Sequence, residues 1–426
     1  MTTARSISWI SSVQKRLGQH LQNQTTDLLS PALHTTRANA VYLDPRRDQV
    51  ARAAPSLVLP STLLPPGHVV ADHLPTTNMP VLLYRDSSSN NTVKAYRNQC
   101  RHRGAALIKP TKGLKQLKGS AVTCPYHAWT YNLGNGELKA VPQEKVGFPC
   151  LKKQDLGLKP LACREIAGGI WVGGQKLSET GDQSVWSLDE VDSELKALWE
   201  TPQQSSSASF NLNRMVGFRE WVLNANWQII VETFLETYHV QFLHHDTLGT
   251  VTHKNVVAVD RLDQRSLRHT VPLLNFQEAG KEKHGNDRIT LQDPFFSQTT
   301  TTYFLFPNVA ISIFKRFFIF LSVLPIANID SNQASIQSRV RAWGVAHGIT
   351  EDGAGRDNSH EMAVQRRDFQ SVIAGIEQDW ECAELIQQGL DADTLIHHGR
   401  FEGNNIAFLR DVGEMAELLS KAKGRN

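Results

Sequence analysis

The sequence has few of the features that would place it in a specialised class of protein. No uninterrupted apolar run approaches the roughly 20 residues that cross a bilayer, so we expect no membrane span. The net charge is only +3 over 426 residues and no block of Lys and Arg stands out, which argues against a nucleic-acid partner. No glycine-rich turn for a dinucleotide or flavin is present. With 40% hydrophobic and 20% charged residues, the chain has the composition of a soluble globular protein.

Cysteine is scarce as well, with five residues in the chain. Cys100 and Cys124 belong to two short motifs that also contain histidine. The other three, Cys150, Cys163 and Cys382, have no regular spacing. An odd remainder of this kind argues against a disulfide framework and favours a reducing compartment. We therefore expect a cytoplasmic protein.

The N-terminal residues permit two interpretations. They include Arg and Lys but no acidic residue before Asp27, and in this they weakly resemble an organelle transit peptide. Their apolar residues recur at helical spacing, which favours an amphipathic helix instead. The residues on that face are Ile10, Val13, Leu17 and Leu21.

The length predicts more than one domain, because 426 residues exceed what one ordinary hydrophobic core accommodates. After an N-terminal segment (residues 1–44), residues 45–175 contain short apolar or alternating runs between turn residues, which predict a small antiparallel β domain. Residues 176–212 are polar, with a short helical pattern at their centre, and we interpret them as a connector. Residues 213–426 then form the second domain.

The second domain begins with a helical pattern and continues with strands. In "NANWQIIVETFLETYHVQFL" (residues 224–243), Ile230, Phe234 and Tyr238 recur every four residues, which predicts a helix. Strand-like runs follow between residues 261 and 348, and a last helical pattern covers about 358–390. Strands and helices in separate blocks are typical of an α+β domain with an antiparallel sheet, rather than of βαβ units.

Two motifs in the first domain predict a metal site. "CRHRGAAL" contains Cys100 and His102, and "CPYHAWTYNLGNGEL" contains Cys124 and His127. Zinc takes two thiolates and two imidazoles readily. A Rieske [2Fe–2S] cluster also needs two of each, with the cysteines on one iron and the histidines on the other. One Cys and one His in each motif favour the cluster, because two loops can then bind it from opposite sides.

A second candidate site lies in the helical pattern of the second domain, where three histidines follow two acidic residues. Non-haem Fe(II) oxygenases bind iron through two histidines and one carboxylate, with open positions for O2 and substrate. Taken alone, the histidines equally fit the C-terminal end of a helix, where imidazoles interact favourably with the helix dipole. The residues concerned are Glu232, Glu236, His239, His244 and His245.

Both motif regions resemble the α (catalytic) subunits of Rieske non-haem iron oxygenases, and the resemblance extends over nearly the whole chain. The two cysteine–histidine loops are similar to the cluster-binding loops of that family, except for Ala128, where a glycine is more usual. The pattern "NW…E…FLETYH….H" resembles the catalytic helix. The segment "GIEQDWECAELIQQGL" resembles the family's C-terminal segment.

The resemblance implies roles for particular residues. Cys100, His102, Cys124 and His127 would bind a [2Fe–2S] cluster. His239 and His244 would bind a mononuclear Fe(II), with His245 outside the set of ligands. Asp379 would be the third ligand, with Glu377 and Glu381 as rivals. Glu236 would link His127 of one subunit to His239 of the next and shorten the electron path.

The resemblance also implies a fold, an assembly and partners. The expected fold is a Rieske β-sandwich domain with a helix-grip (START-like) catalytic domain on which the N-terminal segment packs. The expected assembly is a head-to-tail ring, a homotrimer. A separate NAD(P)H-dependent reductase or ferredoxin would supply electrons, and one or both atoms of O2 would enter a small organic substrate. The sequence leaves open whether a small β subunit is present.

The substrate itself is open at this point. Hydroxylation of an aromatic ring or aromatic acid, as in aromatic compound catabolism, is our first hypothesis. The alternative is a monooxygenase that demethylates or cleaves a quaternary amine, because Glu at position 236 resembles that branch of the family. Two further hypotheses from other classes are an electron-transfer Rieske protein without a second iron and a zinc-stabilised binding module.

Overall fold

The computed structural model describes most residues of the chain. These are residues 8–28, 30, 33–74, 77–87, 91–109, 117–173, 188–199, 215–277, 294–326, 333–346 and 359–423. No described helix is both long and apolar enough to span a membrane. The predicted connector, 176–212, lies outside the described residues except for residues 188–199, which contain helix α6 (Asp189–Trp199), the short helix expected at its centre.

The described residues form two compact units. Pro55 to Gly173 make up one, and the residues up to Ala54, helix α6 and the chain from Met215 make up the other. The prediction of α+β architecture, with one β-rich unit and one unit that combines an antiparallel sheet with helices, is confirmed by the sheets of these two units. Each unit contains one of the two candidate sites.

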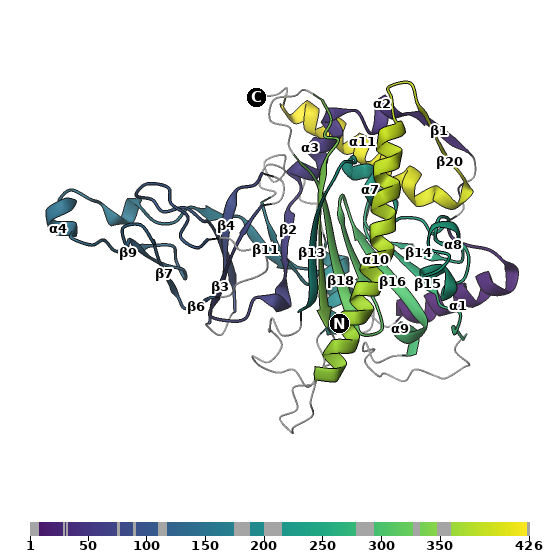
Figure 1. Cartoon of the computed structure of the whole chain (residues 1–426), viewed down its shortest axis with the longest axis horizontal. Helices are drawn as coiled ribbons and strands as arrows, with labels where there is room; N and C mark the ends of the chain where they lie inside the picture. The colour runs from purple at the N-terminus through teal and green to yellow at the C-terminus, as the bar shows by residue number, and fades with distance from the viewer. Residues whose placement is uncertain are drawn as a thin grey trace. The chain divides into compact units, whose positions relative to one another are not determined.

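The first unit consists of short antiparallel strands in three sheets (Figure 1), as the alternating runs in the sequence predict. The five-stranded sheet has the order β10 (Pro160–Leu161), β5 (Val93–Arg97), β4 (Pro80–Arg85), β3 (His68–His73), β6 (Leu117–Lys118). The three-stranded sheets are β11 (Cys163–Ile166), β12 (Gly169–Val172), β2 (Ser56–Pro60), and β7 (Ala121–Thr123), β8 (Thr130–Asn132), β9 (Leu138–Ala140). One of the two cysteine–histidine loops follows β5 and the other joins β7 to β8.

A seven-stranded antiparallel sheet organises the second unit. Its strand order is β13 (Met215–Leu223), β19 (Ser338–Ala346), β18 (Phe317–Pro325), β17 (Val309–Ile313), β16 (Thr299–Leu305), β15 (Leu267–Pro272), β14 (Ala258–Arg261). Strand β18 is buried at every position, because its sequence "FFIFLSVLP" is apolar on both faces. The remaining helices of the unit are α1 (Ser8–Asn23), α2 (Ala38–Val41), α3 (Pro45–Ala53), α7 (Trp227–Glu232), α8 (Val240–Leu243), α9 (Pro294–Gln298), α10 (Ser359–Gly389) and α11 (Gly403–Lys423).

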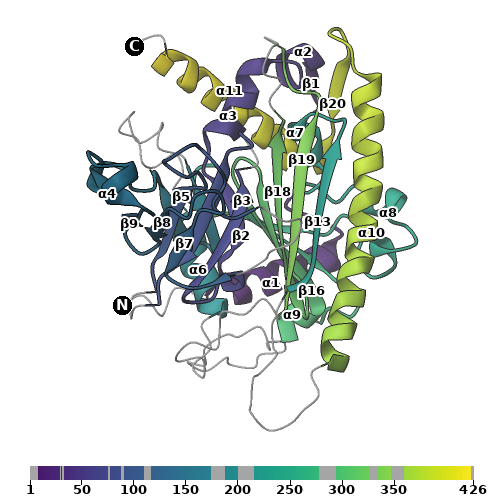
Figure 2. The same cartoon turned by 60° about the vertical axis from the view of Figure 1, so that its left-hand side comes forward.

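Helix α10, the predicted C-terminal helix, packs directly against β13 and β19 (Figure 2). Gly217 on β13 and Gly344 on β19 are neighbours in the ladder, and the ring of Phe369 occupies the space above them. A Cβ atom at Gly217 would lie 2.2 Å from that ring, and one at Gly344 would lie 2.5 Å from it. The two glycines therefore permit the close helix–sheet contact, which fixes the position of the acidic residues farther along α10.

The N-terminal segment belongs to the second unit. Helix α1 buries Ile10, Val13 and Leu17, so the amphipathic helix favoured by the sequence is confirmed. In helix α3 the buried Asp48 accepts two hydrogen bonds. One comes from the Trp227 indole, at 3.1 Å, and the other from the backbone N–H of Ser335, shortly before β19. These bonds tie α3 to helix α7 and to the sheet, so α3 belongs to the second unit and not to the β domain predicted to begin at residue 45.

The prediction of one continuous helix over residues 224–243 is wrong. Helix α7 ends at Glu232 and α8 begins at Val240, with turns between them. Two side chains in the gap bond to the local backbone: Thr233 donates to a carbonyl of the preceding turn, and the Glu236 carboxylate accepts from the amides of Tyr238 and His239. Such local bonds compete with helical ones, and the break places His239 just before α8 and His244 just after it.

Candidate metal centres

The two cysteine–histidine loops have the same backbone structure. In the first, the Cys100 amide donates to the carbonyl of Ala105 and the Gly104 amide donates back to the Cys100 carbonyl, at 2.8 and 3.0 Å. In the second, the Cys124 amide donates to the carbonyl of Trp129 and the Ala128 amide donates back, again at 2.8 and 3.0 Å. Each motif is therefore a tight turn that two backbone hydrogen bonds close.

Ala128 and Gly104 occupy equivalent positions in these turns, and both have a left-handed backbone, with φ of 55° and 78°. A side chain in this region is strained by about 1–2 kcal/mol, partly balanced by the greater entropy that glycine loses on folding. We expect Ala128→Gly to stabilise the loop by about 0.5–1 kcal/mol. The measurement is the denaturant midpoint at which the visible absorbance of the cluster is lost.

Ala167 provides a control in the same unit, because it also has positive φ, 50°, but lies in the turn between β11 and β12. Ala167→Gly should raise the unfolding midpoint of this unit without slowing the loss of the cluster under native conditions. An Ala128→Gly variant that loses its cluster faster than the unchanged protein would contradict the strain argument.

The four side chains of the loops converge. The thiols of Cys100 and Cys124 are buried beside each other, and burial raises the pKa of Cys100. The rings of His102 and His127 lie 4.7 Å apart, and the Nδ1 atom of His102 is buried without a hydrogen-bond partner among the described residues. An unpartnered imidazole nitrogen beside two buried thiols fits a cluster with two sulfur and two nitrogen ligands.

Two aromatic residues of the second motif contact the candidate ligands of this site. The Tyr131 hydroxyl lies 3.3 Å from the Cys100 sulfur and accepts a hydrogen bond from the Arg101 amide at 2.9 Å. Trp129 stacks on the His102 ring, with centroids 4.8 Å apart. Hydrogen bonds to cluster sulfurs raise the reduction potential, so Tyr131 is placed to tune the site.

In the second unit, the turn before α8 and the middle of α10 together form a metal-binding geometry. His239 and His244 bracket α8, and Asp379 lies on α10. The ligand atoms of the three side chains all lie within 4.8 Å of one another, and Oδ1 of Asp379 is 3.0 Å from Nε2 of His244 and 3.5 Å from Nε2 of His239. Atoms that occupy adjacent positions around one ion stand about 3 Å apart, so these residues could hold a single cation.

Both histidines are oriented through their second nitrogen. Nδ1 of His239 donates to Glu236, and Nδ1 of His244 donates to the amide oxygen of Gln378 at 2.8 Å. Each Nε2 therefore has its lone pair available on the side of Asp379. Burial lowers the pKa of His239, but the bond to Glu236 and the charges of Glu236 and Asp379 outweigh it, so the pKa is raised. The sequence gives no signal for Gln378, because an amide on a helix rich in acids has no distinctive spacing.

The alternative candidates lie elsewhere. His245 is exposed and pairs with Asp246, as expected of a residue outside the ligand set. Glu377 accepts a hydrogen bond from the indole of Trp221 at 3.0 Å, and Glu381 is exposed on α10. Of the three acids considered on this helix, the structure brings only Asp379 to the histidines. Glu232 is buried and bonded to Tyr42 and His398 instead.

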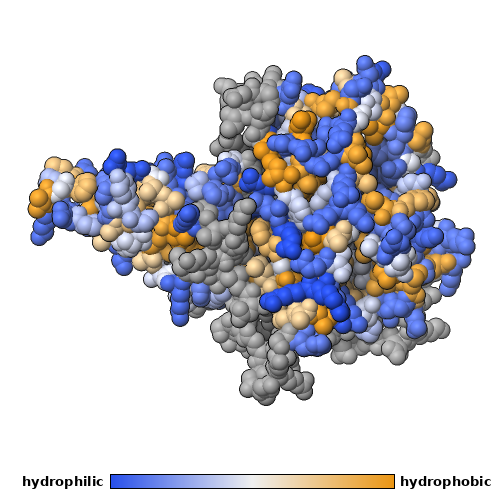
Figure 3. All heavy atoms as spheres, viewed as in Figure 1, coloured by the Kyte–Doolittle hydropathy of each residue, from blue (hydrophilic) through white to orange (hydrophobic). Residues whose placement is uncertain are grey.

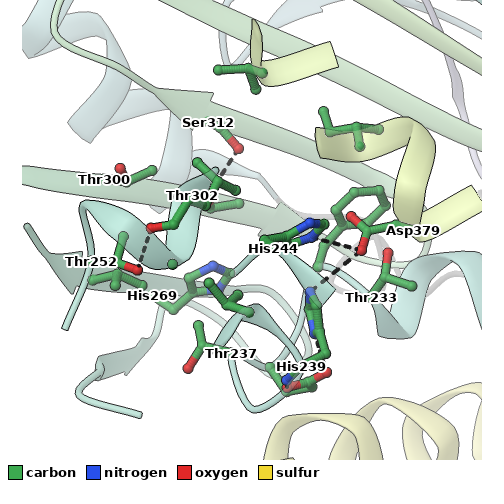
Figure 4. Close-up of a pocket in the computed structure, with 18 of the residues that line it drawn as sticks. Thr233, Thr237, His239, His244, Thr252, His269, Thr300, Thr302, Ser312 and Asp379 are labelled. Atoms are coloured by element: carbon green, nitrogen blue, oxygen red, sulfur yellow. Dashed lines mark hydrogen bonds and ion pairs between the residues drawn. The ribbon is translucent and has the colours of Figure 1, made fainter. Parts of the chain in front are cut away.

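A cavity opens from the three side chains towards the sheet (Figure 4). It contains about 1060 Å³ of empty space, which includes its open mouth. Residues of the α7–α8 segment, of α10 and of strands β15 to β18 line it. Most of its lining surface is apolar, and polar side chains, hydroxyl groups among them, lie both on the sheet side and on the side of the α7–α8 segment. One face of the metal-binding geometry is thus accessible to a small molecule.

Comparison with known families agrees with this arrangement. Residues 56–154 match the Rieske [2Fe-2S] domain, and residues 212–417 match the catalytic domain of the ring hydroxylating alpha subunit. The chain belongs to the Rieske oxygenase family. The two domains of a Rieske oxygenase α subunit hold a [2Fe–2S] cluster and a mononuclear iron, and each of the two sites described above lies within one matched region.

Individual relatives of this Rieske oxygenase chain fall into two substrate groups. It is 29% identical over 195 residues to the biphenyl 2,3-dioxygenase subunit alpha of Rhodococcus jostii, covering 45% of this chain and 37% of that one. It is 30% identical over 185 residues to the glycine betaine monooxygenase oxygenase subunit of Pseudomonas aeruginosa, covering 43% and 38%. The matches thus span little more than a third of these relatives.

A solved structure shows the same fold. The quaternary ammonium Rieske monooxygenase CntA, in complex with an inhibitor, superposes with a TM-score of 0.61 at 16% identity, covering 87% of this chain and 91% of that one. At this level of identity the likeness concerns the fold alone.

Proposed function

We propose that the chain is the terminal oxygenase component of a Rieske system that hydroxylates a small organic substrate. The observation that carries the proposal is the group of His239, His244 and Asp379 at one end of a cavity, in a chain whose other unit presents two thiols and two imidazoles. When bound, the mononuclear iron supplies the activation of O2 and the cluster supplies electrons. The protein residues position the substrate, orient the histidines and exclude water.

In this proposal the electrons come from a separate reductase or ferredoxin that uses NAD(P)H. We also propose that copies of the chain form a head-to-tail homotrimer in which Glu236 links His127 of one copy to His239 of the next. Two features support this. His127 is exposed, and Glu236 already accepts a bond from His239, so that one further contact completes the path.

Exposed apolar residues support an interface at both sites. The first unit has Tyr126, next to His127, at 58% exposure and Val146, in α4 (Glu144–Gly147), at 87%. In Figure 3, hydrophobic residues are exposed among hydrophilic ones at the end of the unit that carries α4. The second unit exposes Tyr238 and Phe242 beside the histidines. Apolar side chains that surround functional groups are typical of protein interfaces.

The preferred substrates in this proposal are aromatic rings and aromatic acids, by mono- or dioxygenation. The apolar part of the cavity's lining surface, which is the larger part, favours them. Similarity to glycine betaine monooxygenase keeps oxidative attack on a quaternary amine as the second candidate. Such a group is commonly held by several aromatic faces, whereas Phe234 and Phe314 are the aromatic residues among those that line the described cavity.

The test is oxygen uptake coupled to NADH oxidation, with a surrogate reductase, purified protein and a panel of aromatic acids and quaternary amines. Substrate-dependent uptake with a hydroxylated or demethylated product supports the proposal and decides between its two substrate classes. Protein that contains a cluster but binds no further iron after reconstitution would instead be an electron-transfer protein, and colourless zinc-containing protein would be a binding module.

A further inference from the structure

The side of the cavity opposite the metal-binding group has a polar row that the proposed chemistry does not use. His269 on β15 is paired with Thr302 on β16, and Thr302 with Ser312 on β17. Directly paired residues of antiparallel strands point to the same face of the sheet. All three line the cavity, and Figure 4 shows them on the strand side, facing the space next to His239 and His244.

His269 is a buried polar group in need of a partner. Only 8% of it is exposed, and its Nδ1 atom has no hydrogen-bond partner among the described residues. Burial lowers its pKa to about 4, so the ring is neutral at neutral pH and presents one N–H donor and one acceptor. A buried imidazole without a partner costs free energy, unless a ligand provides one.

The two hydroxyl groups beside it add a donor. The Thr302 and Ser312 oxygens are 2.9 Å apart, so one hydroxyl donates to the other and the second O–H is free to donate into the cavity. Together with the imidazole N–H, the row offers two donors and no negative charge. This pattern fits an oxygen that accepts two hydrogen bonds.

The charged residues that line the cavity also favour a negatively charged group on the ligand. Its two carboxylates, Glu236 and Asp379, are both bonded to the iron-site histidines. Lys254 also lines the cavity, and no hydrogen bond or ion pair of its ammonium group is present among the described residues. Lys254 is exposed, so water screens its charge, but no carboxylate among the described lining residues opposes it outside the metal-binding group.

We propose that His269, Thr302 and Ser312 bind a carboxylate group of the substrate and thereby orient its reacting carbon towards His239, His244 and Asp379. The inference rests on the proposed oxygenase function but is independent of the choice between an aromatic and an amine substrate, since both classes include carboxylates. The three residues are binding residues, and their effect is on affinity and orientation.

Binding without turnover tests this, by titration calorimetry of the oxidised full-length protein with two matched pairs of probes. Benzoate and toluene share a ring, and glycine betaine and choline share a trimethylammonium group, but only the first of each pair has a carboxylate. We expect at least one carboxylate to bind, and to bind more tightly than its matched probe. Thr302→Val and His269→Leu should each weaken that binding about tenfold or more.

Thr301→Val is the control, because Thr301 precedes Thr302 on β16 but does not line the cavity. Its hydroxyl oxygen lies 3.2 Å from that of Thr270. It should leave the carboxylate affinity unchanged, and no variant should alter binding of toluene or choline. His269→Gln, which keeps a donor and an acceptor, should restore part of the affinity. Equal effects of Thr301→Val and Thr302→Val, or wild-type protein that binds neither carboxylate, would overturn the inference. Oxygen uptake in a separate assay would show whether the oxygenase proposal itself fails.

Discussion

Asp379→Ala is expected to lower the iron content from about three atoms per chain to about two and to reduce turnover by on the order of 10³-fold or more. Asp379 supplies the only carboxylate within reach of both histidines in the described site, and removal of one ligand from a group of three leaves two imidazoles, which hold the metal weakly. The cluster lies in the other unit, so its visible absorbance should be unchanged. Iron analysis, the visible spectrum and oxygen uptake measure the three quantities.

Glu381→Ala is the matched control, because this residue follows Asp379 on the same helix but is exposed. It should retain the third iron and full oxygen uptake. If Glu381→Ala or Glu377→Ala lost the iron while Asp379→Ala kept it, the assignment of the carboxylate would be wrong. Far-ultraviolet circular dichroism on each variant separates loss of a ligand from loss of the fold.

Short-range patterns are the most informative part of the sequence. The two cysteine–histidine turns are local, since each is closed by backbone bonds between residues four and five apart, and their ligand types are evident from the amino-acid sequence alone. The strands β3, β4, β5 and β12 and the long helix α10 likewise follow from apolar runs between turn residues. In these cases the interactions that decide the fold are close in the chain.

Long-range contacts determine the features that the sequence patterns do not predict. Asp379 meets His244 across 135 residues, and no periodicity within α10 distinguishes it from Glu377 or Glu381. Its position depends on how closely α10 packs against the sheet. Gly217 on β13 and Gly344 on β19 determine this distance. The family resemblance indicates Asp379, but local pattern alone does not.

The polar row is not evident in the sequence for a related reason. Strand β15 is buried at all six positions, so its sequence lacks the alternation that would show which side chains face a cavity. His269 becomes notable only when the register places it beside Thr302 and Ser312. Similarly, the break before α8 arises from side-chain bonds of Thr233 and Glu236, which compete with a strong helical pattern.

Glu236→Gln is expected to slow turnover by about 10²-fold while both metal sites remain filled. Glu236 accepts from Nδ1 of His239 and from the adjacent backbone amides, and in the proposed trimer it would also accept from His127 of a neighbouring copy. A neutral amide replaces one acceptor oxygen with a donor, so it cannot satisfy all of these groups at once. The decisive measurement is the rate at which a reduced cluster is reoxidised in a single turnover with substrate and O2.

Two further variants separate an electron path from a merely structural role. Glu236→Asp keeps the carboxylate on a shorter arm and should recover most of the reoxidation rate. His245→Ala alters an exposed histidine beside the site and should leave the rate unchanged. If Glu236→Gln lost iron in proportion to activity, the residue would act only by orienting His239. A slow reoxidation with full iron content requires that Glu236 act between the two sites, since the histidine would then be correctly placed and only its connection to the cluster impaired.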